Sequence, residues 1–467
     1  MKSTPFRIGN LTCLKTLSIF IVSSITGHGL ADLHNLQLGG KLHIKGLQKV
    51  SNEEDARKAN LIGKKDLNHL YLSWGDYASS KVSCVDAEQV LEALEPHSGL
   101  KNFGVQGYTG TQFPCWMKNI SILNGLVSII LYDCKNCRQL PPFGKLPCLT
   151  TLFVSGMRDI KYIDDDVYEP ATKNAFTSLK KLTLCDLQNL ERVLEFKGVE
   201  MLPQLLELYI TNVPKLTLPS LPSVESLSAD GGKEEFLKSI VNNSNMYNLK
   251  SLCISSFDEL KELPVELSTL SALESLEIRF CNQMELFSEQ LLQGLSSLKT
   301  LRISYCPQFV FPDNMNSLTS LRKLDVWKCN EHVLDSLGTS FSNIPSLQNL
   351  SLYNFPSRTS LPDWLGAMTS LQVLDIDDFP KLKSLPDNFQ QLQNLQELSI
   401  AGCPMLSSLP DNFQQLRNLQ KLTIQFCPEL KKRCKRGIGE DWHKISHIPE
   451  LDLNLRTEEA TCCGNLI

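Results

Sequence analysis

Two pairs of side chains in this sequence have a spacing that could support metal or redox chemistry. Cys134 and Cys137 are separated by two residues, as paired zinc or redox thiolates often are. His443 and His447 have the four-residue spacing that places two imidazoles on one face of a helix. No second Cys-x-x-Cys pair occurs, and no further ligand accompanies the histidines. We therefore expect no metal ion, and we expect a structural role in a repeat and in a C-terminal capping segment, respectively.

Motifs of catalysis and nucleotide binding do not occur in this sequence. It contains neither the Gly-x-Ser-x-Gly turn of a serine hydrolase nor the His-Glu-x-x-His helix of a zinc protease. Gly63, Lys64 and Lys65 are not part of a Gly-x-x-x-x-Gly-Lys-Ser/Thr phosphate loop. We therefore expect no catalytic residues and no cofactor, and the sequence does not predict an enzyme.

The charge of the chain favours proteins as partners. Its 467 residues carry a formal net charge of -5, so no basic field attracts nucleic acid or an anionic membrane. The run from Lys431 to Arg436 is locally basic. Nuclear import or phosphate binding is one interpretation of this run, and solvated cover on the last repeat is the interpretation that we favour. We expect a protein partner, no nucleic acid and no membrane.

The cysteines and the N-terminal apolar run bear on the cellular compartment. Leu17 to Val22 is well short of the roughly 20 residues that span a bilayer. A signal peptide is an alternative interpretation, but Leu11, Leu14 and Leu17 already fit a repeat strand. Six of the 16 cysteines recur at one repeat position, where other repeats have Phe257, Phe355 or Phe379: Cys134, Cys281, Cys306, Cys329, Cys403 and Cys427. This pattern indicates an inward apolar position, reduced thiols and a cytoplasmic chain, with the nucleus as the alternative location.

These residues belong to a sequence that repeats itself. The unit is Leu-x-x-Leu-x-Ile-x-x-Cys-Pro-x-Leu-x-x-Leu-Pro, and it is most complete from Leu395 to Pro410. The opening leucines recur every 23 to 26 residues: Leu249, Leu273, Leu298, Leu321, Leu347, Leu371, Leu395 and Leu419. This is the period of leucine-rich repeats.

The pattern within each unit predicts the fold. In a strand, Leu276 and Ile278 point inward while Glu277 and Arg279 point outward. Because one repeat cannot bury its inward side chains alone, neighbouring repeats must stack. We therefore predict an α/β leucine-rich-repeat solenoid. It would be a curved horseshoe with a parallel β-sheet on the concave face and an irregular or short-helix convex side.

The regularity of the repeats changes along the chain. We interpret residues 1–248 as irregular repeats with inserted helices. Residues 249–430 are interpreted as regular repeats of about 24 residues, and residues 431–467 as a C-terminal cap and tail. Ser51 with Glu54 has capping-box spacing and predicts one inserted helix. Asp86 with Gln89 predicts the start of a second helix.

Three stretches resemble the leucine-rich-repeat region of coiled-coil plant disease-resistance proteins of the nucleotide-binding (NLR) class. They are the N-terminal repeats from Ile8 to Trp74, the aromatic motifs at Gly107 to Trp116 and Leu361 to Leu365, and the terminal segment from Cys427 to Pro449. The nucleotide-binding domain of that class has no counterpart in this sequence. The resemblance implies a module that binds a pathogen effector or a guarded host protein, or that regulates a nucleotide-binding (NB-ARC) switch domain.

The outward strand positions of the regular repeats are the candidate contact surface. Exposed Trp, Tyr and Arg are the residue types that most often anchor protein interfaces. Cross-strand charge pairing and shielding of the rim are the alternative explanations for these residues. The candidate partner-binding residues are Glu277, Arg279, Phe280, Arg302, Tyr305, Asp325, Trp327, Tyr353, Asp375, Asp377 and Asp378.

Two other functions are compatible with the sequence. A secreted receptor-like ectodomain would be favoured by a cleavable leader and by glycosylated Asn-x-Ser/Thr sites. A substrate adaptor of a ubiquitin ligase would be favoured by an F-box-like helical segment, which is not visible here.

Overall fold

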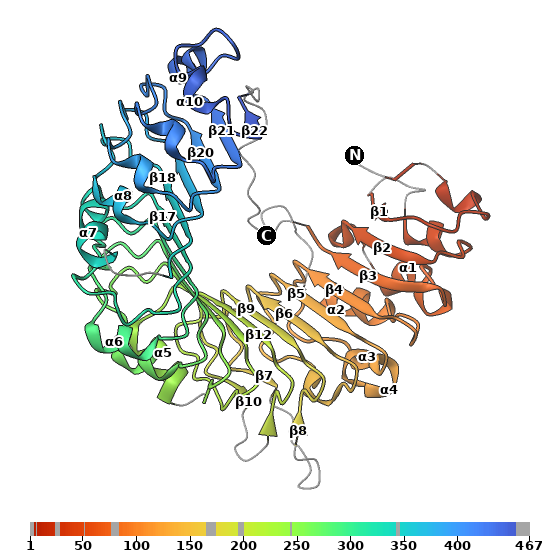
Figure 1. Ribbon diagram of the computed structural model, residues 1–467. Helices are drawn as coiled ribbons and strands as arrows, with labels where there is room; N and C mark the ends of the chain where they lie inside the picture. Colours follow the sequence, from red (N-terminus) through yellow and green to blue (C-terminus); the bar gives the residue numbers. More distant parts are fainter. Residues whose placement is uncertain are drawn as a thin grey trace. The chain divides into compact units, whose positions relative to one another are not determined.

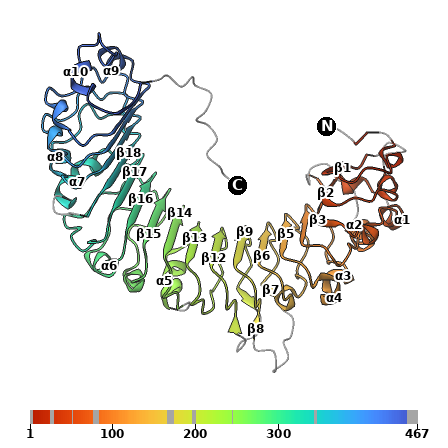
Figure 2. The same ribbon diagram turned by 45° about the vertical axis from the view of Figure 1, so that its right-hand side comes forward.

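The structure is a computed structural model, and it describes residues 4–5, 7–23, 29–50, 52–75, 84–164, 174–194, 200–242, 245–341 and 346–453. The chain divides into two compact units, Met1–Leu249 and Lys250–Ile467. Each unit is a stack of leucine-rich repeats, so the predicted solenoid fold is confirmed. In Figures 1 and 2, the strands of each unit lie side by side, and the helices lie on the opposite side of their repeats.

The first unit is built on a parallel sheet in which successive repeats pair in order. Its strands are β1 (Ile19–Ile21), β2 (Gly40–Lys45), β3 (Leu67–Ser73), β4 (Asn102–Gln106), β5 (Ser128–Tyr132), β6 (Thr151–Ser155), β9 (Lys181–Cys185), β12 (Glu207–Thr211) and β13 (Ser226–Asp230). Two short parallel pairs accompany this sheet: β7 (Tyr162–Asp164) with β10 (Arg192–Leu194), and β8 (Asn174–Ala175) with β11 (Glu200–Met201).

Short helices connect the strands of the first unit. The α-helices are α1 (Glu53–Arg57), α2 (Cys84–Ala93), α3 (Cys115–Lys118), α4 (Ile120–Leu123) and α5 (Glu234–Asn242). The 3-10 turns are η1 (Ile8–Asn10), η2 (Leu30–Leu33), η3 (Leu47–Lys49), η4 (Leu61–Gly63) and η6 (Phe143–Lys145).

Both inserted helices exist, but their predicted starts were wrong. The cap of α1 is Asn52, whose side chain accepts a hydrogen bond from the backbone N–H of Asp55 at 2.8 Å. Ser51, the predicted cap, lies outside the described residues. Helix α2 spans Cys84–Ala93, so Asp86 lies inside the helix and not before its first residue.

The second unit has the more regular sheet, again parallel and paired in chain order. Its strands are β14 (Ser251–Ser255), β15 (Ser275–Arg279), β16 (Thr300–Ser304), β17 (Lys323–Trp327), β18 (Asn349–Tyr353), β19 (Val373–Asp377), β20 (Glu397–Ala401), β21 (Lys421–Gln425) and β22 (Glu450–Asp452). Its helices are α6 (Glu289–Gly294), α7 (His332–Phe341), α8 (Trp364–Ala367), α9 (Pro428–Arg433) and α10 (Trp442–Ile445), with 3-10 turns η7 (Val265–Thr269), η8 (Phe389–Gln391) and η9 (Phe413–Gln415).

The inward register of the regular repeats is as predicted. Leu276 and Ile278 are buried, whereas Glu277 and Arg279 are partly exposed on the same strand. The leucines at the position of Leu276 form an uninterrupted buried row in adjacent strands: Leu252, Leu276, Leu301, Leu324, Leu350, Leu374, Leu398 and Leu422. This shared row makes the stability of each repeat depend on its neighbours.

The recurring cysteine position is also inward, with one exception. Phe257, Phe355 and Phe379 are buried, as are five of the cysteines: Cys134, Cys281, Cys306, Cys403 and Cys427. In these five, the thiol donates to the backbone carbonyl two residues earlier, for example from Cys403 Sγ to Ala401 O at 3.2 Å. Cys329 is only partly buried. Burial raises the pKa of the Cys134 thiol to about 12, which keeps it protonated and unreactive.

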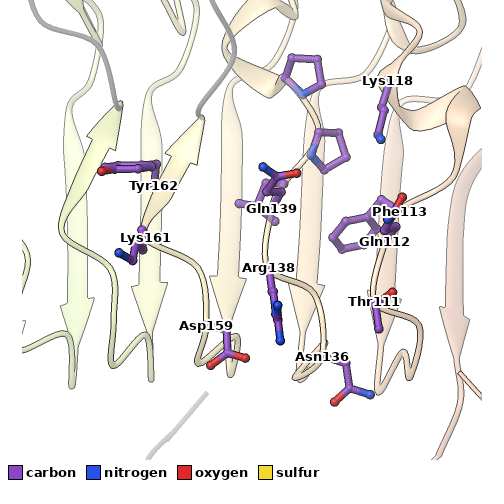
Figure 3. Close-up of a pocket in the computed structure, with 13 residues that line it drawn as sticks. Thr111, Gln112, Phe113, Lys118, Asn136, Arg138, Gln139, Asp159, Lys161 and Tyr162 are labelled. Carbon is purple, nitrogen blue, oxygen red and sulfur yellow. The ribbon is translucent and has the colours of Figure 1, made fainter.

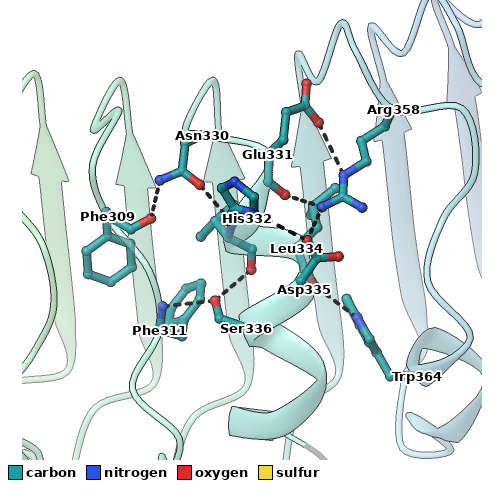
Figure 4. Close-up of polar contacts among 11 residues, drawn as sticks. Phe309, Phe311, Asn330, Glu331, His332, Leu334, Asp335, Ser336, Arg358 and Trp364 are labelled. Carbon is teal, nitrogen blue, oxygen red and sulfur yellow. Dashed lines mark hydrogen bonds and ion pairs between the residues drawn. The ribbon is translucent and has the colours of Figure 1, made fainter.

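Helix α7 occupies the longest step between the opening leucines of the regular repeats, from Leu321 to Leu347, and polar contacts hold it in place (Figure 4). The Arg358 guanidinium lies 3.3 Å from Glu331 Oε2 and 2.6 Å from Asp335 Oδ2. The indole N–H of Trp364 donates to the carbonyl of Leu334 at 2.9 Å. These contacts join α7 to the next repeat, which carries β18.

Candidate functional site

The register of strands β15 to β19 aligns the candidate residues in three rows. The first row is Glu277, Arg302, Asp325, Ser351 and Asp375. The second row is Arg279, Ser304, Trp327, Tyr353 and Asp377. The third row follows the strand ends: Phe280, Tyr305, Lys328, Asn354 and Asp378. The structure therefore brings all the predicted contact residues onto one face of the second unit.

Four aromatic side chains form a continuous row across this face, which we call the aromatic row: Phe280, Tyr305, Trp327 and Tyr353. Phe280 and Tyr305 stack with ring centroids 4.6 Å apart. The rings of Tyr305 and Trp327 follow at 6.2 Å, and those of Trp327 and Tyr353 at 5.4 Å. Trp327 remains 48% exposed and Phe280 45% exposed. The aromatic row thus offers apolar ring surface on a rigid sheet.

Two members of the aromatic row have an unusual backbone conformation. Phe280 and Tyr305 have φ values of 52° and 54°, in the left-handed region where Gly, Asn and Asp are the usual residues. Gly107 and Asn212 occupy the same turn in other repeats. A bulky residue in this region typically costs on the order of 1 kcal/mol or more. Since the turn does not need an aromatic residue, the exposed rings point to a role at the surface.

Cross-strand pairing accounts for part of the charge on this face. Arg302 Nε donates to Asp325 Oδ2 at 2.7 Å, and Lys323 lies 3.5 Å from the same oxygen. Glu277 and Arg279 approach to 3.5 Å. Arg302 and Asp325 are therefore paired across two strands, as the charge-pairing alternative expects, whereas Glu277 pairs with Arg279 within its own strand, β15. Such exposed pairs typically contribute 0–1 kcal/mol.

On the β19 side of this face, the acidic residues Asp375, Asp377 and Asp378 have contacts that differ from those of the charge pairs. Ser351 Oγ donates to Asp375 at 3.2 Å, and the Asn354 amide donates to Asp378. Burial raises the pKa of Asp375 and that of Asp377. In the described part of the chain, these three carboxylates form no ion pair. They remain open to a cation from outside the chain.

Two serines at outward strand positions of this face are buried. Ser304 lies between Arg279 and Trp327 in the sheet, and Ser351 lies between Asp325 and Asp375. A small side chain between larger neighbours is covered by them. Ser304 therefore separates Arg279 from the aromatic row without adding contact surface.

Two family models match the chain, one in each part. The model described as R13L1/DRL21 LRRs matches residues 30–157. The model described as plant disease resistance protein RPS2-like, leucine-rich repeats, matches residues 262–432. These are leucine-rich repeats of the plant disease-resistance type. Repeats of this type are typically protein-interaction modules.

The plant proteins that the chain resembles are named as disease-resistance proteins. The chain is 39% identical over 287 residues to the putative disease resistance protein RGA1 of Solanum bulbocastanum, covering 61% of this chain and 28% of that protein. It is 40% identical over 273 residues to disease resistance protein RGA2 of the same plant, covering 56% and 27%. It is 31% identical over 333 residues to the putative disease resistance RPP13-like protein 1 of Arabidopsis thaliana, covering 66% and 31%. The chain therefore spans less than a third of each of these relatives.

Solved structures with leucine-rich repeats are more distant. A leucine-rich-repeat protein of Leptospira interrogans is 18% identical with a TM-score of 0.49, covering 92% of this chain and 99% of that one. The Toll–Spätzle complex of Drosophila includes a chain that is 15% identical with a TM-score of 0.47, covering 88% and 60%.

Other residues with possible chemistry have structural contacts in these disease-resistance repeats. Cys137 donates its thiol to the carbonyl of Gly110 at 3.3 Å. His443 and His447 contact the backbone carbonyls of Glu440 and Leu416. Within the described ranges, no group of three or more His, Cys, Asp or Glu could hold a metal ion, and no helix there is long and apolar enough to cross a membrane.

Lys64 is also structural. Its ammonium donates to the carbonyls of Leu33 and Leu36 at 2.7 and 2.8 Å. Burial lowers the pKa of Lys64 to about 8. The lysine thus satisfies carbonyls at the end of η2 in the preceding repeat.

Two lysines that are not among the candidate partner-binding residues also contribute to the surface. Lys328 Nζ lies 5.2 Å from the centroid of the Tyr305 ring, a distance suited to a cation–π contact. Lys323 shares Asp325 with Arg302. Lys323 has the outward phase of strand β17, and Lys328 occupies the turn position directly after that strand, like Phe280 and Tyr305 in their repeats, so the repeat pattern could have included both.

Proposed function

We propose that the aromatic row is a protein-recognition surface of a plant disease-resistance receptor, and that its partner is a pathogen effector or a host protein that such an effector modifies. The observation that carries the proposal is the unbroken row of partly exposed rings from adjacent repeats. Trp and Tyr are the side chains that most often dominate the energy of interfaces. A sheet also presents them with little conformational entropy to lose on binding.

The charges beside the aromatic row narrow the chemistry of the partner. Asp377 pairs in register with Tyr353, and Asp375 and Asp378 lie beside it. A partner that inserts an apolar group over Trp327 and a Lys or Arg side chain near these carboxylates would match both features. The proposed partner surface is therefore apolar at its centre and basic on the β19 side.

Replacing Trp327 and Tyr353 together with Ala should weaken partner binding by at least about 2 kcal/mol, roughly thirtyfold in affinity. Both side chains are outward, so the fold should survive their truncation. The wild-type chain and the double variant are used to capture cross-linked proteins from infected leaf tissue, and the captured proteins are compared. Affinities are then measured with each captured protein after purification.

Tyr247→Ala supplies the matched control, because Tyr247 is an exposed aromatic residue outside the aromatic row. It should leave capture unchanged. Equal capture by the wild-type chain and the double variant, with thermal melts of both normal, would show that the contact surface lies elsewhere.

An NB-ARC switch domain is the other partner that the resemblance implies. Co-precipitation of this chain with such a domain, expressed separately, tests that arrangement. Loss of co-precipitation in the Trp327, Tyr353 double variant would assign the aromatic row to regulation of the switch.

We also propose that the chain acts in the cytoplasm or the nucleus, on the basis of cysteines that follow the repeat phase. Thiol counting after denaturation should find nearly all 16 cysteines free. Burial among apolar side chains explains these cysteines without disulfides. Several disulfides in protein purified from plant tissue, or secretion of a fluorescent fusion, would contradict this location.

A further inference from the structure

A second hollowed surface lies in the first unit. It has a volume of about 1310 Å³ and is lined by the segments that follow β4, β5 and β6. In Figure 3, Arg138 and Gln139 of the middle segment lie between Lys118 on one side and Lys161 and Tyr162 on the other. Three successive repeats therefore build this surface, which we call the basic groove.

The size of the basic groove suits a chain better than a compact ligand. Small-molecule sites usually occupy roughly 300–1,000 Å³. Strands in a sheet lie about 4.8 Å apart, so three repeats extend over roughly 10–15 Å. An extended peptide advances about 3.3 Å per residue, so about three to five residues would cross the three repeats.

The charge of the basic groove differs from that of the chain as a whole. Lys118, Arg138 and Lys161 line it, against a single acidic residue, Asp159. Among the described residues, Lys118 and Arg138 have no ion-pair partner. Lys161 Nζ is 3.9 Å from Glu191, and an exposed pair at that distance holds the lysine only weakly. The three cations come from three different repeats, so they match charges that are spaced along a ligand.

Polar and apolar groups complete the lining. Gln112 and Gln139 are exposed and carry amides that can both donate to and accept from a peptide backbone. Phe113 and Pro141 are buried in the lining, and Tyr162 is half-buried. The basic groove thus combines charge contacts, backbone contacts and apolar surface.

We propose that the basic groove binds an acidic, extended segment of a partner protein, with carboxylates opposite Lys118, Arg138 and Lys161. The charge complementarity carries this assignment. The acids beside the aromatic row select a basic partner surface, so the two surfaces select opposite charge. The assignment does not depend on the function proposed for the aromatic row.

The probe is a fluorescein-labelled decapeptide of alternating Glu and Thr, titrated with the full chain and followed by fluorescence anisotropy. The wild-type chain should bind it, and the affinity should fall as salt is added, because exposed charges are screened. The double variant Arg138→Glu, Lys161→Glu should bind at least about tenfold more weakly. A peptide of alternating Lys and Thr should not bind at the basic groove, so the Arg138→Glu, Lys161→Glu double variant should not weaken any binding of that peptide to the chain.

A matched double variant, Arg158→Glu with Lys180→Glu, makes the same change in net charge at exposed residues that do not line the basic groove. It should bind the acidic peptide like the wild-type chain, and so should the Trp327, Tyr353 double variant. Equal weakening by both charge-reversed variants, or no binding by the wild-type chain, would overturn the proposal. Tighter, groove-dependent binding of a single-stranded oligonucleotide would replace it with a general polyanion site. Thermal melts establish that each variant is folded.

Discussion

Replacing Leu276 with Ala should lower the free energy of unfolding by about 2–5 kcal/mol. Leu276 is 2% exposed and lies between Leu252 and Leu301 in the buried row. The substitution removes apolar contacts and leaves a cavity that the stacked repeats can close only in part. Because neighbouring repeats share this row, the loss also weakens the interfaces on both sides of the strand.

The adjacent residue offers the control on the same strand. Glu277 is partly exposed and its only described ion pair is with Arg279, so Glu277→Ala should cost less than about 1 kcal/mol. Thermal and urea unfolding of both variants measure the difference. A larger loss for Glu277→Ala than for Leu276→Ala would mean that the strand register is reversed.

The register was predictable because it is a local property. Alternation with a period of two places Leu276 and Ile278 on one face wherever the strand lies. The stacking of identical units then places Trp327 beside Tyr353, since each strand begins at the same point of the repeat. The alignment of the candidate residues in rows was therefore predictable from the repeat pattern.

Exposure of individual residues was less predictable, because it depends on neighbours in other repeats. Ser304 has the outward phase but is covered by larger side chains on both sides. Cys329 has the inward phase but stays partly exposed, unlike the equivalent Cys306 and Cys403. Cys329 lies in the short segment between β17 and helix α7, where the regular repeat pattern is interrupted.

The starts of the inserted helices and the basic groove were not predictable from the sequence, for two different reasons. Ser51 and Asn52 are both good capping residues, so local preference could not choose between them. Lys118, Arg138 and Lys161 come from connecting segments of irregular length, and no periodic pattern relates them. Only the stacking of the three repeats brings these cations to one surface.

Replacing Asp441 with Ala should destabilise the C-terminal cap by about 3–5 kcal/mol, the usual cost of breaking a buried ion pair. Asp441 is 1% exposed and lies 3.1 Å from Lys444 and 3.2 Å from Arg433. Its carboxylate also accepts from the backbone N–H of Leu409 at 3.0 Å. Without Asp441, the buried Lys444 would keep only the carbonyl of Leu409 and the fully exposed Asp411 as partners. The cap covers the last repeats, so its loss would expose their apolar side chains.

The neighbouring acid again supplies the control, because Glu440 also pairs with Arg433 but is exposed. Glu440→Ala should change the melting temperature little, and a loss as large as that of Asp441→Ala would assign the effect to Arg433 instead.

The pH dependence of stability gives a second test of the role of Asp441. Burial alone would raise the pKa of Asp441, but hydrogen bonds from Arg433, Leu409 and Lys444 hold it below its ordinary value. The folded chain therefore takes up this proton less readily than the unfolded chain, whose Asp has a pKa of about 3.9. The stability from Asp441 is fully present above that pH and is lost as the pH falls through the lowered pKa. The difference in stability between the wild-type chain and Asp441→Ala should accordingly be largest near neutral pH and shrink in acid.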